Sequence, residues 1–407
     1  MSVLVRKGSG LVLGFLRLTL EKLARLFPVR VRKGLTPAYL KFMSIAYSIS
    51  AFPNPAGRSP FEISSRRAVA LAEIRRLIRQ EIKVERSRWS LLRHYEESPS
   101  EIANLCFKEK GIYPISLSIP RIWHRLPASP KQMSRVISTV FPGEKYSFSV
   151  LEDYMHQYSS SALAVTHKKG GWDCFRHLEI MSAGSIPLMP DIQECPRFTM
   201  VHYPKNTMSQ VVRKLSLGKL PDDSVYKFFS DWTREHLSSA AMVDYIFNTL
   251  NLNPKRVLFA DEQLPKRADY LSVFTLIGLM QTKAYHVDVA FPVEYIFEDW
   301  RGDSGKLYGR GFGFGKVVKS EKPDVYWCSK GTCEGPPNMD DHYEIKSNYD
   351  VLVIGDLSAN RAFAKRVDSE FLTMEKVYLR GNDLAPTRSE YRWLKSLRGH
   401  VFSREIY

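Results

Sequence analysis

A basic, glycine-containing loop carries the residues of this chain best suited to bind an anion. Lys168 and Lys169 precede Gly170 and Gly171, and residues 172–183 follow with the spacing of a helix. Two glycines let backbone N–H groups approach a ligand closely, and a helix N-terminus favours negative charge. The lysines add positive charge at the same place. The loop therefore predicts a site for phosphate groups.

Further candidates follow on the predicted helix. Arg176 and Glu179 are three positions apart, so their side chains are neighbours on its surface. A guanidinium suits a diphosphate and a carboxylate suits the vicinal hydroxyls of a ribose, which together predict a nucleotide diphosphate site. His177 is either a ligand contact or a structural histidine. Trp172 is either core or a stacking platform, and Asp173 either contacts ligand or caps the helix.

The elements that must position these residues form a strand–loop–helix–strand unit. Apolar runs at residues 162–166 and 186–189 flank the loop and the helix. Gly184 occupies the place of a C-cap glycine, and the next strand starts within two residues, as a compact crossover requires. Such glycines also occur in purely structural α/β units. The ligand-binding interpretation therefore depends on the basic loop, Arg176, Glu179 and this exit occurring together.

Residues 168–196, KKGGWDCFRHLEIMSAGSIPLMPDIQECP, resemble the donor-binding segment of exostosin-like glycosyltransferases, in which an Arg/Glu-bearing helix leads into an AAGCIPV strand. The preceding residues 137–171 are also similar. Ser185 stands where those enzymes often carry Cys, a small residue in either case. Weaker resemblances to the same proteins lie in residues 307–315 (LYGRGFGFG) and in the tail, residues 399–407 (GHVFSREIY).

The resemblance implies a GT-B glycosyltransferase with two Rossmann-like domains. Such an enzyme moves a sugar from a nucleotide diphosphate to a glycan or lipid-linked acceptor hydroxyl, here with inversion and without a metal or other cofactor. Arg176 and the glycine loop would stabilise the leaving diphosphate, and Glu179 would orient the ribose. Asp261 is the candidate general base, with Glu262 and Asp269 as further candidates, although each also suits a structural role.

The order of the elements predicts four parts: a basic amphipathic leader and linker (1–60), a helical region (61–104), a donor-binding Rossmann-like domain (105–250) and a second Rossmann-like domain on the acceptor side (255–407). The helical region is predicted to contain one long helix over residues 61–97. In GT-B enzymes the donor-binding half usually comes second. Here the donor-like half comes first, so either the order is permuted or the last part has a separate role.

Most of the net charge of +16 lies in residues 1–95, which hold 19 lysines and arginines against 5 acidic residues. Residues 1–34 have the pattern of an amphipathic helix that lies on an anionic membrane surface, packs on the protein or forms a loose leader. Charged residues interrupt it too often for a signal peptide or a spanning helix. No nucleic-acid-binding motif accompanies the charge, so no nucleic-acid partner is expected.

The cysteines are few and odd in number: Cys106, Cys174, Cys195, Cys328 and Cys333. This set favours a reducing compartment over a disulfide framework, and no ligand set for zinc accompanies the last two, although a disulfide between them stays open. The sequence thus predicts a cytoplasmic enzyme, either soluble or peripheral on the membrane. The alternative is a catalytically inactive nucleotide-sugar-binding or scaffold protein of a membrane-associated glycan assembly.

Overall fold

The computed structural model describes residues 88–89, 96–124, 133–140, 142, 148, 150–217, 219–319, 323 and 348–407. Residues Glu85–Tyr407 form one compact unit. The predicted leader and linker, almost all of the predicted helix over residues 61–97, and Cys328 and Cys333 lie outside the described residues. Within that range, Arg88–Trp89 form strand β1, and Glu96 and Glu97 lie outside any helix, so the helix prediction is wrong at these four positions.

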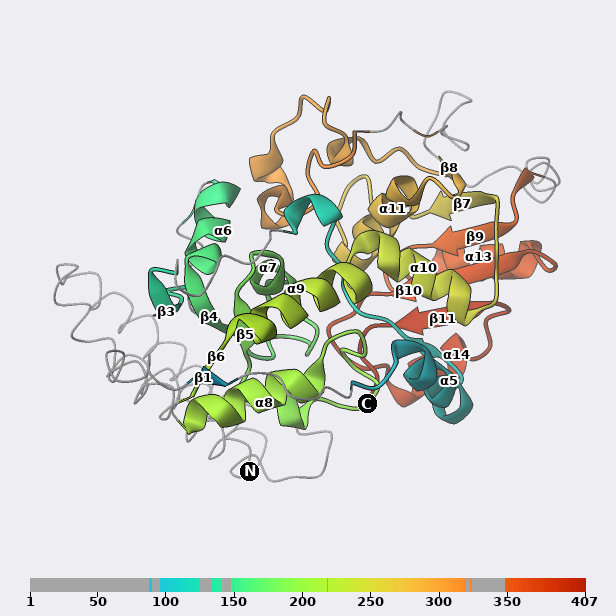
Figure 1. The fold of residues 1–407 in the computed structure, drawn as a ribbon. Helices are drawn as coiled ribbons and strands as arrows, with labels where there is room; N and C mark the ends of the chain where they lie inside the picture. Colours follow the sequence, from blue (N-terminus) through green and yellow to red (C-terminus); the bar gives the residue numbers. More distant parts are fainter. Residues whose placement is uncertain are drawn as a thin grey trace, which may run out of the picture. The chain divides into compact units, whose positions relative to one another are not determined.

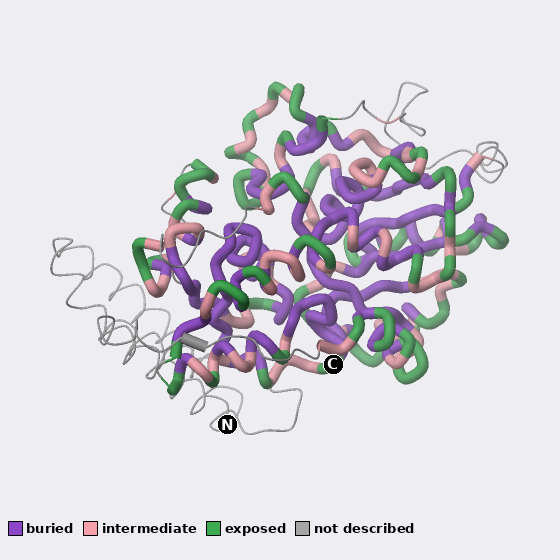
Figure 2. The backbone as a smooth tube through the Cα atoms, viewed as in Figure 1, coloured by how far each residue is buried: buried purple, intermediate pink, exposed green. Residues whose placement is uncertain are grey.

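The larger sheet has six strands, all parallel (Figure 1). In spatial order they are β2 (Tyr113–Pro114), β11 (His400–Ser403), β10 (Glu375–Arg380), β9 (Val351–Ile354), β7 (Arg256–Ala260) and β8 (His286–Val289). Strands β7 and β9 are short apolar runs, as expected for parallel strands covered on both faces, and most residues of the sheet are buried (Figure 2). The chain reverses its direction of winding between the neighbouring strands β7 and β9.

Helices cover this sheet. One face shares an apolar cluster with α5 (Pro99–Lys110), α13 (Arg361–Glu370) and α14 (Arg388–Leu394). Helices α10 (Ser239–Thr249) and α11 (Tyr270–Thr282) lie next to the larger sheet and pack against each other, as Figure 1 shows. Their contact is so close that a Cβ on Gly278 would lie 2.2 Å from the backbone oxygen of Ser239. Only glycine permits that approach.

The smaller sheet contains the segment that the sequence analysis singled out. Its parallel strands are β3 (Arg135–Ile137), β4 (Ser161–Val165) and β5 (Ile186–Leu188), with helices α6 (Leu151–Ser159) and α7 (Phe175–Ser182). The predicted strand–loop–helix–strand unit is confirmed. Gly184 (φ 84°) ends α7 as predicted: its N–H donates to Met181 O (3.0 Å), and the Ser185 N–H donates to Ile180 O (3.2 Å).

The remaining elements are β6 (Leu220–Pro221), which pairs with β1, and helices α8 (Lys205–Ser216) and α9 (Asp223–His236). The α/β class with a mostly parallel sheet is thus confirmed. The two sheets do not divide the chain as predicted, because β2 lies in the segment assigned to the first domain yet pairs with β11 of the larger sheet. No helix in the described ranges is both long and apolar enough to cross a membrane.

Candidate functional site

A pocket of about 440 Å³ opens at the carboxyl edge of the larger sheet. The loops after β7, β9, β10 and β11 form it together with Tyr308: its lining is Arg267, Ala268, Asp269, Tyr270, Tyr308, Asp356, Ser358, Ala359, Gly381, Asn382, Asp383 and Arg404. Ligands of open parallel sheets bind outside the carboxyl ends of the strands, where the strand order reverses. The reversal between β7 and β9 puts the pocket at that position.

Arg404 is the most deeply buried charge of the pocket. Its side chain follows β11 and is only 5% exposed, yet its Nε lacks a hydrogen-bond partner among the described residues. One of its terminal nitrogens donates to Asp383. Burial alone would lower the pKa of Arg404. Four nearby carboxylates raise this pKa above its ordinary value, so the guanidinium stays charged. They are those of Asp173, Asp383, Glu405 and Asp269. A buried N–H without a partner is rare in folded proteins, so the Nε of Arg404 is an unusual feature beside this pocket.

Asp269 and Asp356 bring two carboxylates to the same pocket. Asp269 caps α11, because its Oδ1 accepts from the Ser272 N–H (2.9 Å). Burial, and then the charge of Asp356, raise the pKa of Asp269. The Asp356 N–H donates to Ser272 Oγ (2.6 Å), which ties the loop after β9 to α11. Asp356 itself has φ 31°, in the left-handed region that residues other than glycine rarely adopt.

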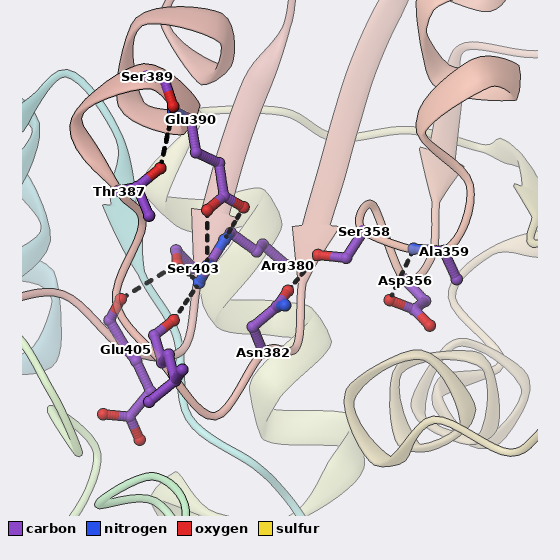
Figure 3. Close-up of polar contacts among 11 residues, drawn as sticks. Asp356, Ser358, Ala359, Arg380, Asn382, Thr387, Ser389, Glu390, Ser403 and Glu405 are labelled. Atoms are coloured by element: carbon purple, nitrogen blue, oxygen red, sulfur yellow. Dashed lines mark hydrogen bonds and ion pairs between the residues drawn. The ribbon is translucent and has the colours of Figure 1, made fainter. Parts of the chain in front are cut away.

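A buried ion pair fixes the loop after β10. Arg380 Nε and a terminal nitrogen donate to the two carboxylate oxygens of Glu390 at 2.9 and 3.2 Å, and Arg380 also donates to Leu384 O (2.9 Å) (Figure 3). The same loop meets the loop after β9, where Ser358 Oγ donates to Asn382 Oδ1. These contacts hold the polar side chains of the two loops beside each other.

Asp261, the base expected from the sequence, lies behind this pocket. It is 2% exposed and is absent from the lining. Its Oδ1 accepts from the N–H groups of Gln263 and Leu264 (3.0 and 3.1 Å) and from Asn360 Nδ2 (2.6 Å), which joins the loops after β7 and β9. Burial raises its pKa to about 7. Asp269 reaches the pocket instead, and Glu262 is an exposed residue outside the lining.

The glycine loop packs against the larger sheet. A Cβ on Gly170 would lie 2.4 Å from Asp383 Oδ2, and one on Gly171 would lie 2.4 Å from Glu405 Oε1. The Asp173 N–H donates to the same Glu405 oxygen (3.0 Å). The loop after β4 thus contacts the loops after β10 and β11. Both glycines lie close against these carboxylates, whereas the sequence analysis assigned them to a phosphate.

Other residues of the loop also make contacts within the protein. Lys168 Nζ lies 5.1 Å from the ring centre of Trp172 and 5.5 Å from that of Tyr407. Trp172 is 5% exposed and therefore part of the core. Asp173 accepts from the Leu117 N–H (2.6 Å) and from another buried group, the Tyr203 hydroxyl (3.0 Å). It precedes the N-cap residue of α7, Cys174, rather than capping the helix itself. Lys169 remains exposed.

The candidates on α7 are largely buried. His177 accepts from the Thr166 hydroxyl (2.9 Å) and donates from Nε2 to Trp172 O (2.8 Å); burial lowers its pKa to about 4, so it is neutral. Glu179 is 4% exposed and accepts from the Tyr154 hydroxyl (2.8 Å). Burial raises its pKa, which the Tyr154 hydrogen bond and the charge of Arg176 lower in part. Arg176 and Glu179 are therefore neighbours, as their spacing predicts, but neither lines the pocket.

The sequence analysis missed most of the pocket. Arg404 and Asp356 come one and two residues after buried strands, which was the available signal for these two residues. Arg267 and Asp383 lie further along the loops after β7 and β10, where no such signal existed. Of its three base candidates, Asp269 alone lines the pocket.

No protein-family model matches this chain, and no curated protein or solved structure is significantly similar to it. In the part of the chain that the structure describes, no group of three or more His, Cys, Asp or Glu residues is arranged to hold a metal ion. The three described cysteines, Cys106, Cys174 and Cys195, are free thiols.

Proposed function

We propose that this chain is a glycosyltransferase that moves a sugar from a nucleotide diphosphate to a hydroxyl of a glycan or lipid-linked acceptor. The observation that carries the proposal is the pocket itself, which the buried and charged Arg404 lines. Arg267 lines the same pocket, and guanidinium groups suit the oxygens of a diphosphate. Asp356 and Asn382 offer groups that suit sugar hydroxyls. The volume, about 440 Å³, is in the range of small-ligand sites.

The relation of the two parallel sheets supports a GT-B arrangement. Carboxyl-end loops of both sheets meet where Gly170 and Gly171 pack on Asp383 and Glu405. In a GT-B enzyme the active site lies between two Rossmann-like halves at such a meeting. The pocket favours placing the diphosphate at the larger sheet, beside the glycine loop rather than within it. Five of the six strands of the larger sheet follow the smaller sheet in the chain, which is the usual position of the donor-binding half.

The proposed reaction is a single displacement. The acceptor oxygen forms a bond to the anomeric carbon as the bond from that carbon to the diphosphate oxygen breaks, and the leaving oxygen takes the electron pair. Arg404 and Arg267 stabilise the charge on the leaving diphosphate. The acceptor proton passes to Asp269, which lines the pocket and whose pKa is raised by burial and by the charge of Asp356, so that it accepts a proton more readily than an ordinary carboxylate. The roles expected for Arg176 and Glu179 in binding the donor stay predictions.

Ligand-induced thermal stabilisation tests the proposal. A panel of nucleotide diphosphate sugars is added to the wild-type chain, where a ligand at a hundred times its Kd stabilises by about 2.7 kcal/mol. Arg404→Lys keeps the charge but loses the planar fork, so the stabilisation should fall sharply. Arg213→Ala, a change on α8 away from the pocket, is the control and should leave it unchanged.

Stabilisation by no nucleotide sugar, or equal stabilisation of wild type and Arg404→Lys, would contradict the proposal. A positive binding result is followed by an assay for donor hydrolysis and for transfer to a glycan acceptor. Binding without either reaction would favour the non-catalytic nucleotide-sugar-binding protein.

A further inference from the structure

A tyrosine stands at the mouth of the pocket with most of its surface in solvent. Tyr308 lines the pocket, yet it is 64% exposed. Its ring lies beside that of Tyr270, with centroids 5.3 Å apart and planes tilted by 58°. Tyr270 packs in turn on Phe175 of α7 (4.6 Å) and on Phe274 (5.7 Å). The exposed ring is therefore supported by Tyr270, which itself packs on two buried aromatic residues.

The backbone next to Tyr308 is constrained. Three successive residues, Gly309, Arg310 and Gly311, have φ of 56°, 57° and 70°. Arg310 donates to Phe148 O (2.8 Å), and Phe312 is buried in the apolar cluster of the smaller sheet. An exposed aromatic side chain held by such a segment loses little conformational freedom when a ligand stacks on it, so binding costs less entropy.

We propose that Tyr308 is the platform on which a pyranose ring of the acceptor stacks. This inference deepens the proposed function, on which its assignment to the acceptor rests. A pyranose presents C–H groups on a face that suits an aromatic ring, and hydroxyls at its edge that suit the carboxylate and amide groups of Asp383 and Asn382 in the same lining. The alternative occupant with a flat face is the base of the nucleotide, since bases also stack on aromatic rings.

Depth separates the two occupants. The diphosphate belongs with Arg404, which is 5% exposed, whereas Tyr308 is 64% exposed at the rim. A glycan acceptor must extend from the reacting hydroxyl into solvent, so its ring needs a support at the mouth. The acceptor is accordingly a pyranoside. The rest of the glycan, or its carrier, extends from the pocket into solvent past Tyr308.

The test compares Tyr308→Ala, Tyr308→Phe and Leu217→Ala. Leu217 is equally exposed (64%) but lies at the end of α8 outside the pocket lining, which makes it a matched control. Saturation-transfer NMR with methyl pyranosides and disaccharides of several configurations gives sugar affinities, and thermal stabilisation gives nucleotide affinities. Tyr308→Ala should weaken pyranoside binding on the order of fivefold, and Tyr308→Phe should retain it. Leu217→Ala should behave as wild type.

Several results would overturn the inference: no pyranoside binding by the wild type, equal pyranoside affinity in wild type and Tyr308→Ala, or a loss confined to nucleotide binding. The proposed function can fail independently. If Tyr308 governs pyranoside binding but no nucleotide sugar stabilises the chain, the stacking site stands and the transferase proposal falls. If nucleotide sugars bind and Tyr308→Ala transfers the sugar with an unchanged acceptor KM, the transferase proposal stands and the stacking site falls.

Discussion

Asp261→Asn should make the stability of this protein less dependent on pH. The folded state holds the pKa of Asp261 at about 7, against an ordinary value of 3.8, chiefly because the carboxyl is buried at 2% exposure. At a pH below 3.8 the carboxyl is protonated in both the folded and the unfolded chain, so it does not change the free energy of unfolding. As the pH rises toward 7, the unfolded chain ionises first, so the folded state loses relative stability.

The size of the effect follows from the shift. Each unit of pKa is worth about 1.36 kcal/mol, so the shift of Asp261 costs up to about 4 kcal/mol above pH 7. The interval from pH 5 to pH 7 covers about two units of this pKa shift, so the free energy of unfolding should fall by up to about 3 kcal/mol across it. The amide that Asp261→Asn introduces does not titrate. Its oxygen can still accept from Asn360, while its NH₂ group adds a cost of about 1–3 kcal/mol that does not vary with pH.

Urea denaturation of both proteins at about pH 5 and about pH 8.5 measures this difference. Relative to wild type, Asp261→Asn should gain stability on going to the higher pH. Asp350→Asn is the control, because hydrogen bonds from the Arg256 and Lys255 N–H groups lower the pKa of Asp350. The stability that Asp350 contributes is fully present above its ordinary pKa of 3.8. The Asp350→Asn variant should therefore lose the same stability at about pH 5 and at about pH 8.5. Parallel behaviour of wild type and Asp261→Asn would refute the burial argument.

Two further substitutions test the packing around the glycine loop and α7. Gly171→Ala places a Cβ 2.4 Å from Glu405 Oε1 and should cost about 1–3 kcal/mol in urea denaturation, whereas Gly305→Ala meets only an exposed side chain and should cost little; equal costs would contradict the packing argument. Tyr154→Phe removes the hydroxyl that donates to buried Glu179 and that also hydrogen-bonds to the Tyr158 hydroxyl (2.9 Å), and it should cost about 1–3 kcal/mol. The part of this cost that comes from Glu179 should vanish in a Glu179→Leu background; additive costs in a double-mutant cycle would show that the two side chains are not coupled.

Local patterns were sufficient where the information is local. The alternation of apolar runs with helical spacing predicted β4, α7 and β5, because strand and helix periods are properties of consecutive residues. Gly184 was predictable for the same reason, since many helices end on a left-handed glycine just after their last turn. Likewise the three-residue spacing of Arg176 and Glu179 predicted that they are neighbours.

The same patterns did not show which charged groups would be buried. Glu179 was expected to contact a ribose and His177 was left open between a ligand contact and a structural role, and the structure gives them partners from other elements, the Tyr154 and Thr166 hydroxyls. The glycines were expected at a phosphate, and they lie against Asp383 and Glu405 from the far end of the chain. A sequence pattern identifies a polar residue but not the distant group that satisfies it.

The sequence by itself determined the α/β class and the strand–loop–helix–strand unit of the smaller sheet, because these depend on periodicity within short segments. Tertiary structure alone decided that β2 joins β11, that the strand order reverses between β7 and β9, and that Asp269, Asp356 and Arg404 meet in one pocket. These relations join residues far apart in the chain. They are set by complementary packing of whole elements, which no window of consecutive residues contains.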